Sequence, residues 1–214
     1  MGCLASRVAG RAHREKQRGR ESGAIISSGL KVDWAALLGD NGPMPDPQHP
    51  AAWLPEQLLA DVDEKRFKSS GPGGQHRNKV ETAVRLTHRP TGITGTAAER
   101  RSQGQNREMA LLRLRGALAL ELRMPLAPEG YTPSATWLRR TSKPGLSVNP
   151  RHQDVPALLA EALDMLAALN DDMAAAAQAL SVSTSRLVKV LKLDPAALTA
   201  VNSRLKAAGR STWR

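Results

Sequence analysis

The 214 residues suffice for one medium domain or two small ones, and 41% apolar content supports small cores only. One Phe and one Tyr argue against an aromatic-rich β-sandwich and favour helical cores. The net charge of +11 indicates an anionic partner, nucleic acid before a membrane surface, and a single cysteine excludes an internal disulfide framework.

Residues 1–50 are expected to form a disordered basic leader followed by a linker rich in Gly and Pro. Met1 to Ser6 fits a myristoylation pattern, and the basic run from Arg7 to Arg20 resembles a transit peptide. We favour a disordered leader, or a start codon assigned too early, over both. Since no apolar run approaches the roughly 20 residues of a membrane span, we expect a cytoplasmic protein without a membrane partner.

Residues 51–124 are expected to form a small α+β domain, a short mixed β-sheet packed on a helix. A short helix is predicted at residues 54–59. A longer one is predicted from about Gln103 to Arg123, with Ser102 as its N-cap, because leucines recur there at three- and four-residue steps. Four arginines are expected to stay largely exposed on this helix: Arg107, Arg113, Arg115 and Arg123.

The strands are predicted from shorter signals. An extended stretch near Phe67 leads into a glycine-rich loop. Residues 83–88 alternate, so that Val84 and Leu86 face one way while Arg85 faces the other, which is typical of a half-buried strand with a basic outer face. A turn at residues 90–92 then leads to a second strand at residues 93–96.

Residues 125–153, interrupted by Pro, Ser and Gly, are predicted to be a second linker, and residues 154–214 a small all-α domain. Helices are expected at residues 156–169, 173–180 and 184–192, and a last one begins at Asp194-Pro195. The second and third resemble a helix-turn-helix that would present Arg186 and Lys189 to nucleic acid. A purely structural or protein-docking role for this unit is the favoured alternative.

The segment from Ser69 to Lys79 carries the most chemical information. Its glycines Gly71, Gly73 and Gly74 leave a backbone that a ligand can approach closely, and basic and polar residues follow at once: His76, Arg77, Asn78 and Lys79. Lys79 comes too late for a Walker phosphate loop. Such a loop suits insertion into a cavity lined by RNA phosphates, although an ordinary surface turn remains an alternative.

From Phe67 to about Arg123 the chain resembles the peptidyl-tRNA hydrolase domain of bacterial class I peptide chain release factors. The resemblance rests on Ser-Ser-Gly-x-Gly-Gly-Gln-His-x-Asn-Lys at residues 69–79, on Ala-Val-Arg-Leu-Thr-His at 83–88, and on Glu-Arg-Arg-Ser-Gln at 99–103 with Asn106. Arg77 replaces the Val usual in the family, and residues 94–98 replace an apolar strand, which puts the packing of that strand in doubt.

The resemblance implies a catalytic Gly73-Gly74-Gln75 loop that enters the peptidyl transferase centre and promotes attack of water on the ester of peptidyl-tRNA. A backbone N–H at Gln75 would stabilise the oxyanion. Contacts with large-subunit rRNA are then expected from nine residues: His76, Arg77, Asn78, Lys79, Arg85, Arg100, Arg101, Gln103 and Asn106. No metal or cofactor is expected, and a glutamine methyltransferase acting on Gln75 is a further predicted partner.

Codon reading is not expected. The chain has no room for a codon-recognition domain and contains no Pro-x-Thr or Ser-Pro-Phe tripeptide. Residues 151–214 hold eight basic and six acidic residues, unlike the Lys/Arg-rich tail of short rescue factors. The sequence therefore predicts a codon-independent, ribosome-dependent peptidyl-tRNA hydrolase, an enzyme of translation release or ribosome rescue. The alternative is a ribosome- or RNA-binding factor that keeps the fold with little hydrolase activity.

Overall fold

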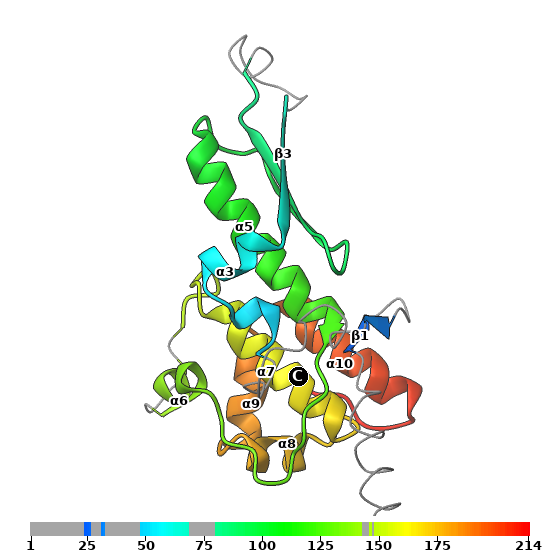
Figure 1. Ribbon diagram of the computed structural model, residues 1–214. Coiled ribbons are helices and arrows are strands. Elements are labelled where there is room, and N and C mark those ends of the chain that lie inside the picture. Colours follow the sequence, from blue (N-terminus) through cyan, green and yellow to red (C-terminus); the bar gives the residue numbers. More distant parts are fainter. Residues whose placement is uncertain (1–23, 27–30, 33–47, 69–79, 143–145, 147) are drawn as a thin grey trace, which may run out of the picture.

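The computed structural model describes residues 24–26, 31–32, 48–68, 80–142, 146 and 148–214 (Figure 1). A small sheet and the long helix α5 (Gln103–Glu121) make up one end of the molecule, and helices α7 (Val155–Ala168) to α10 (Pro195–Ala207) make up the other end, with α7 packed on α5. The predicted α+β class is confirmed. No helix of the described residues is long and apolar enough to cross a membrane.

The sheet has the strand order β3-β4-β5 and consists of β3 (Val62–Phe67), β4 (Ala83–His88) and β5 (Thr94–Ala97). Both pairs are antiparallel, so the expected mixed sheet was wrong. Three strands that follow one another through direct reversals pair in this way. In β4 the predicted alternation is confirmed, because Val84 and Leu86 are fully buried while Arg85 is exposed.

Helix α5 covers the buried face of the sheet (Figure 1). It begins at Gln103, after Ser102, whose side chain accepts a hydrogen bond from the Gln105 N–H, as predicted. Opposite β5 its backbone comes very close to the strand. A Cβ added to Gly95 would lie 2.8 Å from the Cα of Leu114 and nearer still to the Ala110 carbonyl oxygen. The glycine at this position therefore fixes how closely helix and sheet can pack.

The expectation of four exposed arginines on α5 was half right. Arg107 and Arg113 are exposed, but Arg115 is buried and Arg123, just beyond the helix, lies beside the buried Asp164. The physical reason is that α5 is covered on more than one face. The sheet packs on it, and so do α7 and the 3-10 turn η1 (Pro50–Ala52). There the guanidinium of Arg115 donates hydrogen bonds to backbone carbonyl oxygens.

The helical part contains α7, α8 (Met173–Ala179), α9 (Thr184–Leu191) and α10, close to the predicted ranges. Each of the last three is capped by the side chain before it, from Asp172, Ser183 and Asp194 respectively. Gly209, with φ +68°, follows the last helix, as expected for a residue that ends a helix.

Three short elements lie in segments that were predicted to be linkers. Helix α6 (Ala135–Thr141) buries Trp137, whose indole N–H donates to the Leu180 carbonyl at 2.9 Å. One large buried side chain is enough to fix a two-turn helix that has little periodicity of its own. Strands β1 (Ala24–Ile26) and β2 (Lys31–Val32) pair with each other, and β1 pairs with β6 (Leu122–Arg123), so these five residues of the expected leader and linker are ordered.

The sheet side and the helices share one hydrophobic core, which runs from Leu58 and Val84 through Leu118 to Leu158 and Leu187. The short helix α3 (Pro55–Ala60) contributes Leu58. An ion pair strengthens the junction, because Arg123 Nη1 lies 3.1 Å from Asp164 Oδ1, which also accepts from the Met124 N–H. The two halves are therefore packed against each other rather than joined only by a linker.

Stability below neutral pH is expected to depend on His49. Burial, aided by the charge of Arg123, lowers the pKa of His49 from 6.5 to about 3 in the folded protein. The unfolded chain therefore binds a proton below pH 6.5 that the folded chain excludes, and stability falls by about 1.4 kcal/mol per pH unit until the folded pKa is reached.

The measurement is the free energy of unfolding in urea at about pH 7.5 and about pH 5 for wild type and His49→Gln. Groups that titrate in both proteins cancel in the difference. Wild type should lose roughly 2 kcal/mol more than the variant between the two pH values. Parallel losses would show that His49 is not the group responsible.

Candidate functional site

Residues 69–79, which include the predicted catalytic Gly73, Gly74 and Gln75 and the predicted RNA contacts His76, Arg77, Asn78 and Lys79, lie outside the described residues. The strands that carry this segment are described. Phe67, the last residue of β3, pairs with Ala83, the first residue of β4. The segment is therefore attached to two adjacent antiparallel strands at the same end of the sheet.

The chain entering β4 is held by Asn106, in the first turn of α5. This side chain is fully buried, and its Nδ2 donates to the Thr82 carbonyl at 2.7 Å and to the Arg100 carbonyl at 2.8 Å. Its Oδ1 accepts from the Arg100 N–H at 2.9 Å. Both ends of the amide are thus used inside the chain, so the geometry gives no support to the predicted contact of Asn106 with RNA.

Strand β3 is held by other side chains in the first turns of α5. Arg107 Nε lies 2.7 Å from a Glu64 carboxylate oxygen, and Arg66 lies 3.1 Å from the other. The hydrogen bond from Arg107 is the main cause of a lowered pKa of the Glu64 carboxyl. With its amide oxygen toward Arg66, Gln103 accepts from that guanidinium, so this side chain also contacts the sheet. The first turns of α5 thus hold both strands next to the Gly-Gly-Gln segment.

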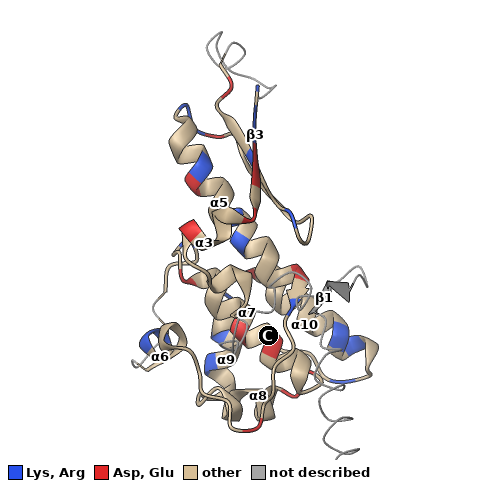
Figure 2. Cartoon of the chain, viewed as in Figure 1, with Lys and Arg blue, Asp and Glu red and all other residues tan. Residues whose placement is uncertain are grey.

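Three predicted RNA contacts are exposed. Arg85 lies on the outer face of β4, where its guanidinium is 5.5 Å from the centroid of the Phe67 ring and its Nε donates to Thr96 Oγ1 at 3.4 Å. Arg100 and Arg101 precede α5 and have no ion pair among the described residues. Figure 2 shows basic residues at the start of α5, at the end of the molecule where β3 also ends.

Sequence reasoning missed the contact of Thr82 with Asn106 and the burial of Arg115. Thr82 contributes a backbone carbonyl, which no side-chain pattern can indicate. Arg115 was assigned to the exposed face of a helix because its burial depends on η1 and on the turn before α7, both distant in sequence. In the described part of the chain, no three His, Cys, Asp or Glu side chains are placed to hold a metal ion.

The helix-turn-helix interpretation is changed by the position of Arg186. Its guanidinium donates to the Thr141 carbonyl at the end of α6, so it is engaged within the chain. Lys189 is exposed on α9. One of the two basic side chains expected to meet nucleic acid is therefore committed to packing α9 against α6.

Comparison with known proteins gives the class to which the sheet and α5 belong. Residues 58–132 match the RF-1 domain family. The chain is 50% identical over 74 residues to peptide chain release factor 1 of Chlorobaculum tepidum, covering 31% of this chain and 21% of the relative. It is 54% identical over 59 residues to peptide chain release factor 2 of Variovorax paradoxus, covering 28% and 16%.

A longer match, 44% identical over 87 residues, is to peptide chain release factor 1 of Kineococcus radiotolerans, and it covers 41% of this chain and 22% of the relative. The chain thus spans about a fifth of the length of the curated relatives that it matches. The predicted resemblance to class I release factors is confirmed over residues 58–132, the part of the chain that the RF-1 domain family matches.

Proposed function

We propose that this protein releases nascent peptides by hydrolysing the ester of peptidyl-tRNA in the peptidyl transferase centre, without reading a codon. The observation that carries the proposal is the RF-1 domain match, together with a Gly73-Gly74-Gln75 segment joined to β3 and β4. Water adds to the ester carbonyl, the tetrahedral oxyanion collapses, and the products are a free peptide carboxylate and the tRNA hydroxyl. A backbone N–H at Gln75 stabilises the oxyanion.

The partners are the rRNA of the large subunit and P-site peptidyl-tRNA. Exposed Arg85, Arg100 and Arg101 supply contacts to phosphates, and the basic residues of the 69–79 segment add to them. A glutamine methyltransferase that modifies Gln75 is a further proposed partner. The contacts of α5 with both strands support this role, since a loop that must place one backbone N–H needs firm attachments.

Codon independence is supported by the part of the chain beyond the RF-1 domain. The match to that family ends at residue 132, and the next described elements are the helices α6 to α10, of which α7 packs on α5 while α6, α8 and α9 pack on α7, and α10 on α9. These helices, rather than a basic tail, are proposed to recruit the protein to its ribosomal target.

The test is release of labelled formyl-methionine from ribosomes that carry a stop codon, a sense codon or no codon in the A site. We expect equal release in all three cases. Release with stop codons alone would overturn codon independence while leaving the hydrolase in place. Binding to ribosomes with no release in any case would overturn the hydrolase and favour an RNA-binding factor with a release-factor fold.

A further inference from the structure

A groove lies where α5 faces the turn that precedes α7. It has a volume of about 400 Å³, and its lining combines apolar Met109, Leu112 and Pro150 with basic Arg100, Arg113 and Arg151 and acidic Glu99. We call it the junction groove. Arg100 belongs to the RF-1 domain, whereas Pro150 and Arg151 lie beyond residue 132, where that family match ends. The side of the groove formed by Pro150 and Arg151 therefore exists only because the helical part is packed on α5.

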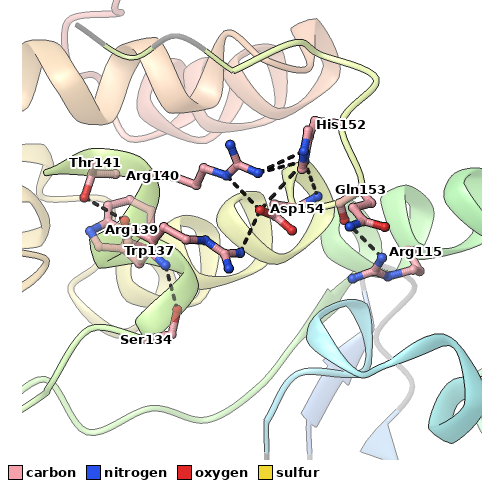
Figure 3. A network of polar contacts seen from close by, with 9 residues as sticks. All are labelled: Arg115, Ser134, Trp137, Arg139, Arg140, Thr141, His152, Gln153 and Asp154. Carbon is pink, nitrogen blue, oxygen red and sulfur yellow. Dashed lines mark hydrogen bonds and ion pairs between the residues drawn. The ribbon is translucent and has the colours of Figure 1, made fainter. Parts of the chain in front are cut away.

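The turn that forms one side of the groove is held by polar contacts to α5 and α6 (Figure 3). Arg115 of α5 donates to the Gln153 carbonyl at 3.0 Å and to the Ala51 carbonyl at 2.9 Å. The next residue, Asp154, accepts from Arg139 at 2.9 Å and from Arg140 at 2.7 Å, both on α6. These contacts fasten the turn to α5 and α6, so the groove is a fixed feature of the fold.

The two basic residues of the groove project from fixed backbone positions. The Arg151 N–H donates to Asn149 Oδ1 at 2.9 Å. The N–H and the carbonyl of Arg100 are both bonded to the Asn106 amide. Because their backbones are already ordered, each guanidinium loses only side-chain freedom when it binds a ligand.

The charge in the groove is not balanced by the chain itself. A third arginine in its lining, Arg113, forms an ion pair with Glu99 and donates to the Thr96 carbonyl. Arg100 and Arg151 are exposed, and neither is paired with an acid among the residues that the structure describes. The groove thus offers two available cations beside an apolar surface.

A polyanion with flat apolar groups between its charges matches this lining. Single-stranded RNA has that composition, since unstacked bases alternate with phosphates and pack on apolar side chains and on guanidinium planes. The polarizable thioether of Met109 suits such a contact. An acidic peptide would satisfy the two cations but would leave the apolar surface without a regular partner.

We propose that the junction groove binds single-stranded RNA, with phosphates at Arg100 and Arg151 and a base against Met109 and Leu112. The proposal deepens the proposed function and rests on it for one point, that the RNA is ribosomal. It adds an RNA contact that lies outside the Gly-Gly-Gln segment and that depends on the helical part of the chain.

The experiment measures binding of the full chain to a fluorescein-labelled oligouridine by fluorescence anisotropy over a range of salt concentrations. Arg100→Gln and Arg151→Gln should each weaken binding roughly three- to ten-fold at low salt and reduce the slope of log K against log salt by about 0.7. Arg214→Gln is the matched control, since it removes the same charge from an exposed position outside the groove and should change neither quantity.

Met109→Ser separates the base contact from simple charge attraction. It should weaken oligouridine binding and leave inorganic polyphosphate binding unchanged, with the thermal unfolding of each variant confirming an intact fold. Wild-type affinity in both arginine variants, or equal competition by polyphosphate or polyglutamate, would overturn the proposal. Binding to free RNA requires no hydrolysis, so a protein that fails to release peptide refutes the proposed function without affecting this result.

Discussion

Replacing Gly74 or Gln75 with Ala should lower ribosome-dependent peptide release by at least about a hundred-fold, because both changes disturb the placement of the Gln75 N–H that we propose stabilises the oxyanion, and losing one such donor costs about that much. In Gly74→Ala the added Cβ would occupy space that the substrate is proposed to approach. In Gln75→Ala the side-chain amide, which the resemblance to release factors implies helps to orient water, would be lost. Single-turnover release of formyl-methionine from ribosomes without an A-site codon measures both effects.

Ribosome binding should stay within about three-fold of wild type in both variants, because Arg85, Arg100 and Arg101 still supply the phosphate contacts. Gly116→Ala is the matched control, since the new Cβ has no atom within 4 Å and the substitution lies within α5. Unchanged release by Gly74→Ala and Gln75→Ala would contradict the proposed chemistry. Loss of binding together with release would instead show that the segment serves attachment.

Local patterns predicted much of the fold because they act over a few residues. The alternation of Val84, Arg85 and Leu86 predicted β4 with its correct limits, and the capping side chain of Asp194, followed by Pro195, predicted the start of α10. The alternation that predicts a half-buried strand and the capping residue that predicts a helix start both involve only a few neighbouring residues.

The interior polar contacts could not be predicted in the same way. Asn106 has the pattern of a polar residue at the start of an exposed helix, yet it is buried because Thr82 and Arg100 offer it backbone partners. Arg115 and Arg123 likewise fit the helical period of an exposed face, and that period cannot indicate that α7 packs over them. Such residues are placed by chain segments distant in sequence, so a pattern within one helix assigns them to the surface.

For the strand at residues 94–97, the sequence did not indicate how the strand packs, and the structure supplies the reason. Its Thr-Gly-Thr-Ala sequence lacks the large apolar residues of a core strand, which left its packing in doubt. The structure shows that a small residue is required, because α5 lies against β5 at Ala110 and Leu114. Bulk is supplied by the helix, where Leu114 and Leu118 are fully buried.

Gly95→Ala is therefore expected to destabilise the protein by about 3 kcal/mol, at the upper end of the cost of overpacking a core. The added Cβ meets the Ala110 carbonyl and the Leu114 backbone, and neither can move without shifting α5 away from the sheet. Equilibrium unfolding in urea measures the change. Since Asn106 sits one turn before Ala110 on the same helix, a shift of α5 also loosens its hold on Thr82 and should lower peptide release.

The same helix supplies the control. Gly116→Ala adds an identical methyl group where no atom lies within 4 Å, and it should stabilise α5 by up to about 1 kcal/mol through its helix propensity. The two variants thus change stability in opposite directions for one chemical change, and only the distance to neighbouring backbone separates them. Equal stability of Gly95→Ala and wild type would mean that α5 and β5 are not in close contact, and the proposed support of the Gly-Gly-Gln segment by α5 would fail with it.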